Sequence, residues 1–122
     1  MNYENKKILK ELLKDEILPN VSNKDYVETL GLKNEFTKIR TIKLLDSYEE
    51  LKWWLSTNIK AKAYGQLFES KLIIPFDDMC KGVNKILERS VFTHEYGIYL
   101  EKVRNKVTES VLKSLNDKSP EL

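Results

Sequence analysis

Apolar residues recur at helical spacing along most of the chain. The first such repeat covers residues 8–17 and ends before Pro19, which interrupts helices. Ser22 and Asn34 each precede a new apolar repeat and are expected to be helix N-caps, with Gly31 as a C-terminal stop between them. No segment alternates between apolar and polar residues as a half-buried strand would. The pattern therefore predicts helices.

The helix predicted after Asn34 is expected to kink or restart at residues 46–47. Beyond that point one apolar face is predicted to continue as far as Phe68, with Gly65 loosening the end of the helix. The residues expected to face inward before and after the kink are Phe36, Ile39, Ile42, Leu45, Leu44, Tyr48, Leu51, Leu55, Ile59 and Tyr64.

Trp53 and Trp54 are adjacent within this segment. Neighbouring residues on a helix point about 100° apart, so both can be buried only if the helix is covered on two sides. The pattern favours core packing. The alternative is a pair of partner-facing aromatics, which makes Trp53 and Trp54 interface candidates, together with Tyr99.

The second half of the chain repeats the helical pattern. Residues 72–74 before Pro75 are read as a buried connector rather than a short strand, and residues 76–87 form a clean apolar stripe. Valines at every fourth position mark a last helix, and residues 116–122 are expected to be a frayed tail. Together these patterns predict one all-α domain over residues 1–122, a helical bundle of about five helices.

Composition narrows the function classes. The 122 residues suit one domain, and 41% hydrophobic with 33% charged residues is typical of a globular protein. The net charge of +2 arises from 21 Lys and Arg against 19 Asp and Glu, so any contact with nucleic acid must depend on local placement. The longest apolar run, residues 72–76, is too short for a bilayer. With no apolar signal segment at the N-terminus, a cytoplasmic protein without membrane association is expected.

The chain has one cysteine, Cys80, and one histidine, His94. These two residues cannot fill a tetrahedral zinc site, so no metal is expected, and no cofactor motif is present in the sequence. Cys80 lies in an apolar stripe and is expected to be a small core residue.

His94 is preceded by Arg89 and followed by Tyr96. A neutral imidazole can take a proton from a ribose 2′-hydroxyl, and an arginine fork can stabilise the charge that develops on the attacked phosphate. This route of RNA cleavage needs no metal. Tyr96 could orient the imidazole or stack on a base.

The spacing of Arg89 and His94 matters for this chemistry. On a continuous helix they would lie about 140° apart, which favours a site completed by a second subunit. A helix break between residues 87 and 93 would instead let them face each other across a turn. Thr93 as an N-cap and Glu95 as a first-turn acid favour the break.

The motif Arg89…His94-Glu95-Tyr96 resembles the Arg-x4-His-x-Tyr signature of HEPN-domain ribonucleases, and more narrowly that of HepT-like toxins encoded beside a minimal nucleotidyltransferase antitoxin. The connector at residues 73–75 and the flanking helices are also similar, over roughly residues 64–115. The resemblance implies a homodimeric bundle with both motifs in the subunit cleft, acting on RNA within a toxin–antitoxin or phage-defence pair. It implies that His94 is the base or acid, Arg89 the phosphate stabiliser and Tyr96 the residue that the antitoxin adenylylates.

Two residues depart from the pattern of that family. Ser90 stands where Asn, Asp or His is usual, so it is a weaker supporting residue for the site. Glu88 stands directly before Arg89 and could pair with it, drawing the guanidinium away from a phosphate.

Two non-catalytic alternatives remain open. Residues 92–101 faintly resemble the small helical subunit of type III CRISPR effector complexes, which contacts RNA phosphates and needs one basic face. Residues 94–101 also resemble helical immunity proteins that neutralise a toxin through a surface patch, with Tyr96, Tyr99 and Trp54 as anchors. For the first alternative, the CRISPR-type subunit, the residues that could form the basic face are Lys60, Lys62, Lys102, Arg104 and Lys106.

Overall fold

The chain is all-helical over the residues described. The computed structural model describes residues 1–117 and has seven α-helices, one 3-10 turn and no strand in that range. None of these helices has the length and apolar content that a bilayer-spanning segment needs. The helices are α1 (Tyr3–Leu13), α2 (Asn23–Thr29), α3 (Glu35–Asp46), α4 (Ile59–Leu67), α5 (Phe76–Leu87), α6 (Thr93–Ile98) and α7 (Leu100–Asp117), with the 3-10 turn η1 (Trp53–Leu55) between α3 and α4.

The all-α prediction is confirmed, but the predicted number of about five helices is too low. Residues 47–58 contain no α-helix and only the short 3-10 turn η1, so α3 and α4 are separate helices. The chain leaves helical geometry again at Tyr99, whose φ of −116° and ψ of 29° separate α6 from α7. The first interruption begins at residue 47, where a kink or restart was expected, but the chain does not return to an α-helix until Ile59. The second lies inside an apolar repeat that continues through it, so the periodicity alone does not reveal it.

Short polar side chains fix the starts of several helices. The side chain of Ser22 accepts a hydrogen bond from the Asp25 N–H at 3.1 Å, and that of Asn34 accepts one from Thr37 at 3.1 Å. Both predicted N-caps are thus confirmed. Gly31 ends the α2 region with a φ of +69°, a left-handed conformation that favours glycine.

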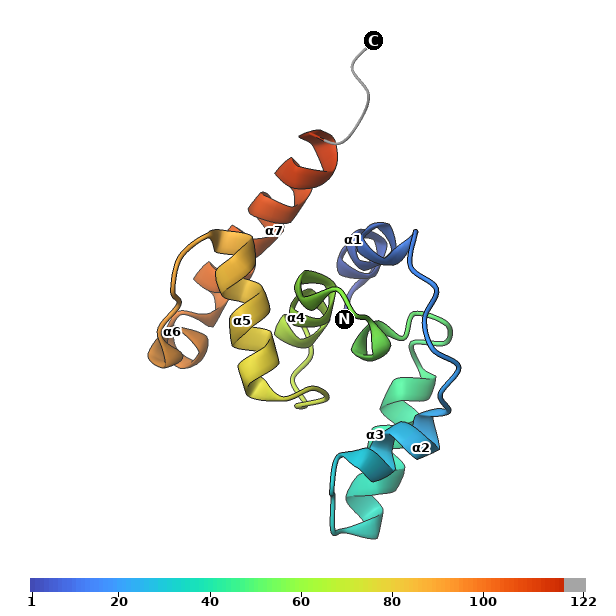
Figure 1. Cartoon of the computed structure of the whole chain (residues 1–122). Helices are drawn as coiled ribbons and strands as arrows, with labels where there is room; N and C mark the ends of the chain where they lie inside the picture. The colour runs from blue at the N-terminus through green and yellow to red at the C-terminus, as the bar shows by residue number, and fades with distance from the viewer. Residues whose placement is uncertain (118–122) are drawn as a thin grey trace.

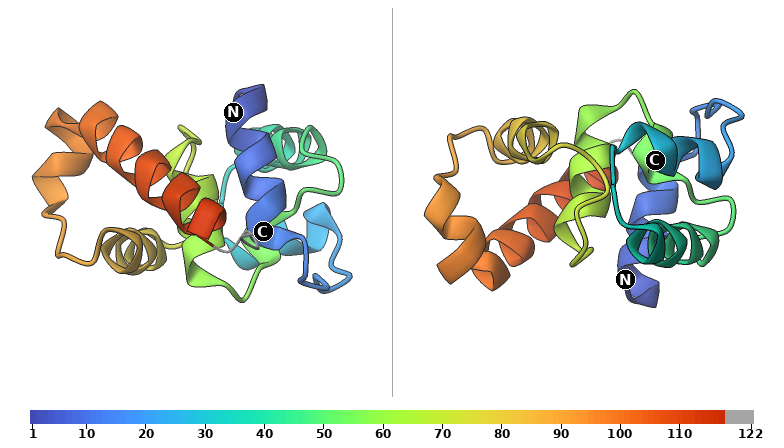
Figure 2. Two further views of the ribbon diagram at one scale, coloured as in Figure 1. Left: turned by 90° about the horizontal axis from the view of Figure 1, so that it is seen from above. Right: turned by 90° about the horizontal axis from the view of Figure 1, so that it is seen from below.

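Helix α4 lies at the centre of the molecule. It packs most extensively against α5 and also contacts η1 and α1, whereas α7 packs across α5, α6 and α1 (Figures 1 and 2). The α2–α3 pair lies on the side of the molecule opposite to α5 and α6 (Figure 1). Gly82 allows α4 and α5 to pack closely, because a Cβ there would overlap Ala63 and the Ile59 carbonyl.

An aromatic cluster fills the core between η1, α4 and the α2–α3 pair. Trp53 and Trp54 are 0% and 1% exposed, and the Tyr48 ring meets both edge-on, with centroids 6.0 and 5.8 Å away. Core packing of the tryptophan pair is therefore confirmed, and neither indole offers surface to a partner. Gly65 lies inside α4 rather than loosening its end, and a Cβ there would overlap the Trp53 ring.

The segment between α4 and α5 is the predicted buried connector. Ile73 and Ile74 are buried as predicted, whereas Leu72 is 55% exposed. The Gln66 side-chain carbonyl accepts hydrogen bonds from the N–H groups of Ile73 and Ile74 at 2.7 and 3.0 Å. The Tyr26 hydroxyl donates to the Ile73 carbonyl at 2.7 Å, which joins this connector to α2. The buried Gln66 side chain thus accepts the hydrogen bonds that a neighbouring β-strand would accept from these amides in a sheet.

Several predicted inward positions are exposed. Ile17 is 97% exposed because α1 ends at Leu13, four residues before it. Phe36 is 67% exposed and Ile39 half exposed, since α3 buries its other face through Thr41 and Leu45. In the predicted tail, residues 116 and 117 still belong to α7, and residues 118–122 lie outside the described residues.

Candidate functional site

A sharp turn separates α5 from α6 at the predicted motif. Glu88 follows α5 in the left-handed region, with a φ of 55°. Asn84 holds the turn from inside α5, because its backbone carbonyl accepts from Arg89 N–H at 3.2 Å and its side chain accepts from Val91 N–H at 2.8 Å. The predicted helix break is therefore confirmed.

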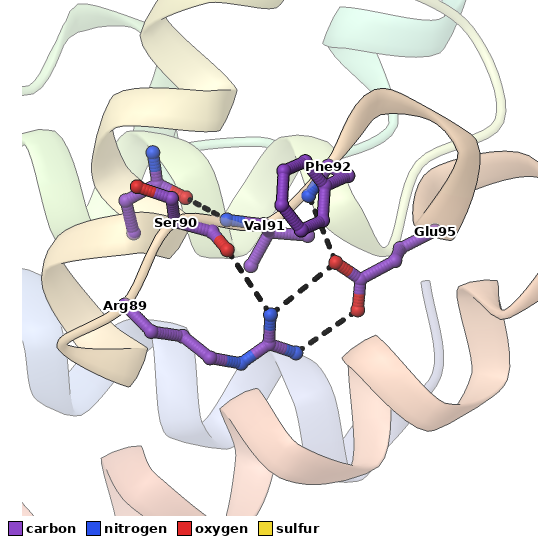
Figure 3. A network of polar contacts seen from close by, with 6 residues as sticks. Arg89, Ser90, Val91, Phe92 and Glu95 are labelled. Carbon is purple, nitrogen blue, oxygen red and sulfur yellow. Dashed lines mark hydrogen bonds and ion pairs between the residues drawn. The ribbon is translucent and has the colours of Figure 1, made fainter.

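Glu95 is the polar centre of this turn. Its carboxylate accepts the Phe92 N–H at 2.8 Å and both terminal nitrogens of Arg89 at 3.0 and 3.2 Å, as Figure 3 shows. Phe92, not Thr93, is thus the residue before the first turn of α6, and Glu95 supplies the cap from inside the helix. The Ser90 backbone carbonyl accepts a further hydrogen bond from Arg89 at 3.2 Å.

The predicted competition for Arg89 exists, but its source is Glu95 rather than Glu88. Hydrogen bonds to Glu95 raise the pKa of the Arg89 guanidinium. In return, hydrogen bonds from Arg89 and from Phe92 N–H lower the pKa of the Glu95 carboxyl below its ordinary value. The pair is a fully charged, two-bond contact whose net charge is zero.

His94 is exposed in the first turn of α6. Its ring stacks on Phe92 with centroids 5.9 Å apart and an interplanar angle of 8°, and it meets the edge of Tyr99 at 6.5 Å. Within residues 1–117 its ring nitrogens have no hydrogen-bond partner. The imidazole is therefore accessible from solvent, and its contact with Tyr99 connects it to the surface beside Arg89.

Tyr96 points into the interface between α5 and α6. Its ring meets Phe76 edge-on at 5.5 Å, and its buried hydroxyl lies beside the thiol of partly buried Cys80. Burial raises the pKa of this hydroxyl well above its ordinary value. Tyr96 thus holds α6 against α5 and, in this structure, neither touches the imidazole nor presents its hydroxyl for modification.

A pocket of about 220 Å³ opens next to the Arg89–Glu95 pair. It lies between the α5–α6 turn and the first turns of α7, and Tyr99 forms part of its wall. Lys102 and Lys106 contribute two ammonium groups. In the sequence both lysines were candidates only for a broader basic face, although Lys102 and Lys106 follow Tyr99 by three and seven residues, about one and two helical turns, which was a usable signal.

The other residues suggested for a basic face lie elsewhere. Arg104 donates to the Leu67 carbonyl at 2.9 Å and to Glu101 at 2.7 Å, so its guanidinium is engaged. Lys60 lines a different pocket, beside α5 and the end of α7. Only Lys102 and Lys106, among the five candidates, line the pocket next to Arg89.

Residues 1–117 contain no group of three or more His, Cys, Asp or Glu side chains placed to hold a metal ion. The side chains gathered at the pocket are a guanidinium, a carboxylate, two lysines and the Tyr99 ring, which the exposed imidazole contacts from outside the pocket.

No family model matches this chain, and no curated protein or solved structure was found to be similar to it. The resemblance to HEPN-domain ribonucleases consequently depends on the motif and the surroundings described above.

Proposed function

We propose that this protein is a metal-independent endoribonuclease of the HEPN type, acting as the toxin of a toxin–antitoxin or phage-defence pair. One observation carries the proposal: the only histidine of the chain is exposed at the start of α6, in ring contact with Tyr99, which lines the same pocket as Arg89. An acid–base group and a cation thus border a surface with further positive charge. These are the groups that cleavage of RNA through its own 2′-hydroxyl requires.

In the proposed reaction His94 takes the proton of a ribose 2′-hydroxyl. The freed oxygen attacks the adjacent phosphorus and the bond to the 5′-oxygen breaks, giving a 2′,3′-cyclic phosphate. The leaving 5′-oxygen takes a proton from water, and the His94 imidazolium releases its proton to the solvent. Arg89 stabilises the charge on the non-bridging oxygens. A phosphate presents two oxygens to the guanidinium as the Glu95 carboxylate does, so the substrate can replace Glu95 without leaving Arg89 unpaired.

The test is cleavage of bulk cellular RNA by the purified protein in excess EDTA. The wild type is expected to produce fragments with cyclic-phosphate ends. His94→Ala and Arg89→Ala are each expected to lower the rate at least about 100-fold, the usual value of a positioned acid–base or charge-stabilising group. Arg40→Ala, which removes an arginine from the exposed face of α3, is the matched control and should cleave like the wild type. Intact RNA after incubation with the wild type would refute the proposal.

A second candidate is a non-catalytic protein that neutralises a toxin by binding it. The observation that favours it is the apolar surface around His94, where Phe92 is 65% and Ile98 73% exposed, while Arg89 is already paired with Glu95. Such a protein would leave RNA intact, and its protective effect in cells would survive His94→Ala but not the double variant Phe92→Ser/Ile98→Ser. A ribonuclease has the opposite dependence on His94.

A further inference from the structure

We propose that Lys102 and Lys106 form a phosphate subsite that holds a phosphodiester next to the one at Arg89. This inference rests on the proposed function, since it names the residues that bind the substrate beside the reacting bond. Neither lysine belongs to the Arg89–Tyr96 motif.

The two lysines share one face of α7. They are four residues apart, so their side chains lie one above the other, and buried Val103 lies between them in sequence at the base of the pocket. Arg89 reaches the same pocket from the α5–α6 turn. An RNA strand passing through the pocket would therefore meet the Arg89 guanidinium on one side and the two lysine ammonium groups on the other.

The charge of the pocket also favours an anion. Arg89 and Glu95 cancel each other, which leaves the positive charges of Lys102 and Lys106. Neither lysine forms an ion pair within residues 1–117, in contrast to Lys14, Lys38 and Arg104. Lys102 instead lies over the Tyr99 ring, with its Nζ 5.3 Å from the centroid, a contact that leaves it able to bind an anion.

The surroundings of the lysines suit a nucleotide better than a peptide carboxylate. Tyr99, His94 and Phe92 form a row of ring contacts leading away from the pocket, and all three side chains are exposed. Exposed aromatic faces beside a basic groove stack bases regardless of sequence. Lysine binds phosphate as a mobile point charge, which requires no fixed planar geometry.

The experiment measures binding of a fluorescein-labelled oligoribonucleotide by fluorescence anisotropy, with all proteins carrying His94→Ala so that the probe is not cut. In this background Lys102→Gln and Lys106→Gln are each expected to weaken binding several-fold. Each should also reduce the slope of log K against log salt by about 0.7 between about 50 and 200 mM, the effect of one lost phosphate contact to a single strand. Lys113→Gln removes an exposed lysine of α7 outside the pocket and should bind like its parent.

Two results would overturn the subsite: Lys102 and Lys106 variants that bind like Lys113→Gln, or no binding of the probe by the parent at about 50 mM salt. The RNA cleavage assay separates this inference from the proposed function. Lysine-dependent binding without cleavage by the wild type would retain the subsite and refute the nuclease. Cleavage with lysine-independent binding would retain the nuclease and refute the subsite.

Discussion

Glu95 connects the formation of α6 to the state of Arg89. One carboxylate caps the helix through Phe92 N–H and binds the guanidinium with two hydrogen bonds. These two contacts have different requirements, because the cap needs only an acceptor oxygen, whereas the hold on Arg89 depends on negative charge. The residue therefore offers a way to release Arg89 while keeping the turn.

We predict that Glu95→Gln increases the affinity for RNA and does not decrease the rate of cleavage. Glutamine retains an oxygen for the Phe92 N–H but loses the charge that competes with phosphate for Arg89. The measurements are oligoribonucleotide anisotropy in the His94→Ala background and RNA cleavage in EDTA. Glu101→Gln is the control, since it removes a carboxylate paired with Arg104 on another face of α7. Weaker binding by Glu95→Gln than by Glu101→Gln would show that Glu95 supports the ligand rather than competing with it.

Glu16 makes folding stability depend on pH. Burial acts to raise the pKa of its carboxyl, but hydrogen bonds from the Ser56 hydroxyl and from the N–H and hydroxyl of Thr57 outweigh burial and hold the pKa below the ordinary 4.5. A carboxyl whose pKa is lowered in the folded state stabilises the protein at pH values above the ordinary pKa of that carboxyl. This contribution is lost as the pH falls through the folded-state value.

We therefore predict that Glu16→Gln lowers the free energy of unfolding at neutral pH. This difference should shrink as the pH falls from 4.5 towards the lower folded-state pKa, because over that range the unfolded chain binds the proton more readily than the folded one. Urea unfolding at neutral pH and at about pH 4 measures both effects. Glu109→Gln, at an exposed position of α7, should have a small effect at either pH. A constant difference between wild type and Glu16→Gln across this range would contradict the prediction.

At the scale of helices and turns, most of the local signals in the sequence were reliable, Thr93 as a cap and Gly65 as a helix end being exceptions, whereas contacts between distant segments left no signal. Ser22 and Asn34 were predicted as caps because a cap depends on residues within one turn. The exposure of Phe36 was not predictable, since periodicity finds an apolar face but not whether a neighbour covers it. The Glu95–Arg89 contact escaped for a similar reason, because it spans a turn whose shape depends on Asn84.

The glycines of the helices give a test of packing that the sequence alone did not suggest. Gly65 faces Trp53, and any Cβ there must displace a fully buried indole. Gly97 in α6 has no atom within 4 Å of the position that a Cβ would take. The same substitution should therefore have opposite effects at the two positions.

We predict that Gly65→Ala destabilises the protein by about 3 kcal/mol, at the upper end of the usual cost of overpacking a core. Gly97→Ala should instead stabilise it by about 0.5–1 kcal/mol, because alanine has the higher helix propensity and nothing obstructs its methyl group. The free energies of unfolding from urea titration provide the comparison. Equal effects of the two substitutions would show that α4 and η1 do not pack as closely as described.

At the scale of the whole molecule, an exposed apolar surface formed by Phe92 and Ile98 lies at α6, close to the candidate site. Phe92 stacks on His94, and Ile98 lies one helical turn after His94, so an interface formed through Ile98 would lie next to the imidazole. Exposed apolar patches of this kind commonly mark protein interfaces. The resemblance to HEPN-domain proteins implies a homodimer with both motifs in one cleft, and this surface is where two copies would bring their histidines together.

We predict that the protein is a dimer in solution and that Ile98→Ser converts it to a monomer by placing a hydroxyl in an apolar contact. Phe36→Ser is the matched control, because it removes an equally exposed apolar residue from α3, on the far side of the molecule from α6 (Figure 1). Sedimentation velocity over a range of protein concentrations gives the mass of each. A wild type that stays monomeric, or a dimer broken by Phe36→Ser and not by Ile98→Ser, would contradict the prediction. If the dimer forms through α6 and both His94 residues act in one cleft, RNA cleavage by Ile98→Ser should fall together with the dimer fraction and recover at protein concentrations that restore it.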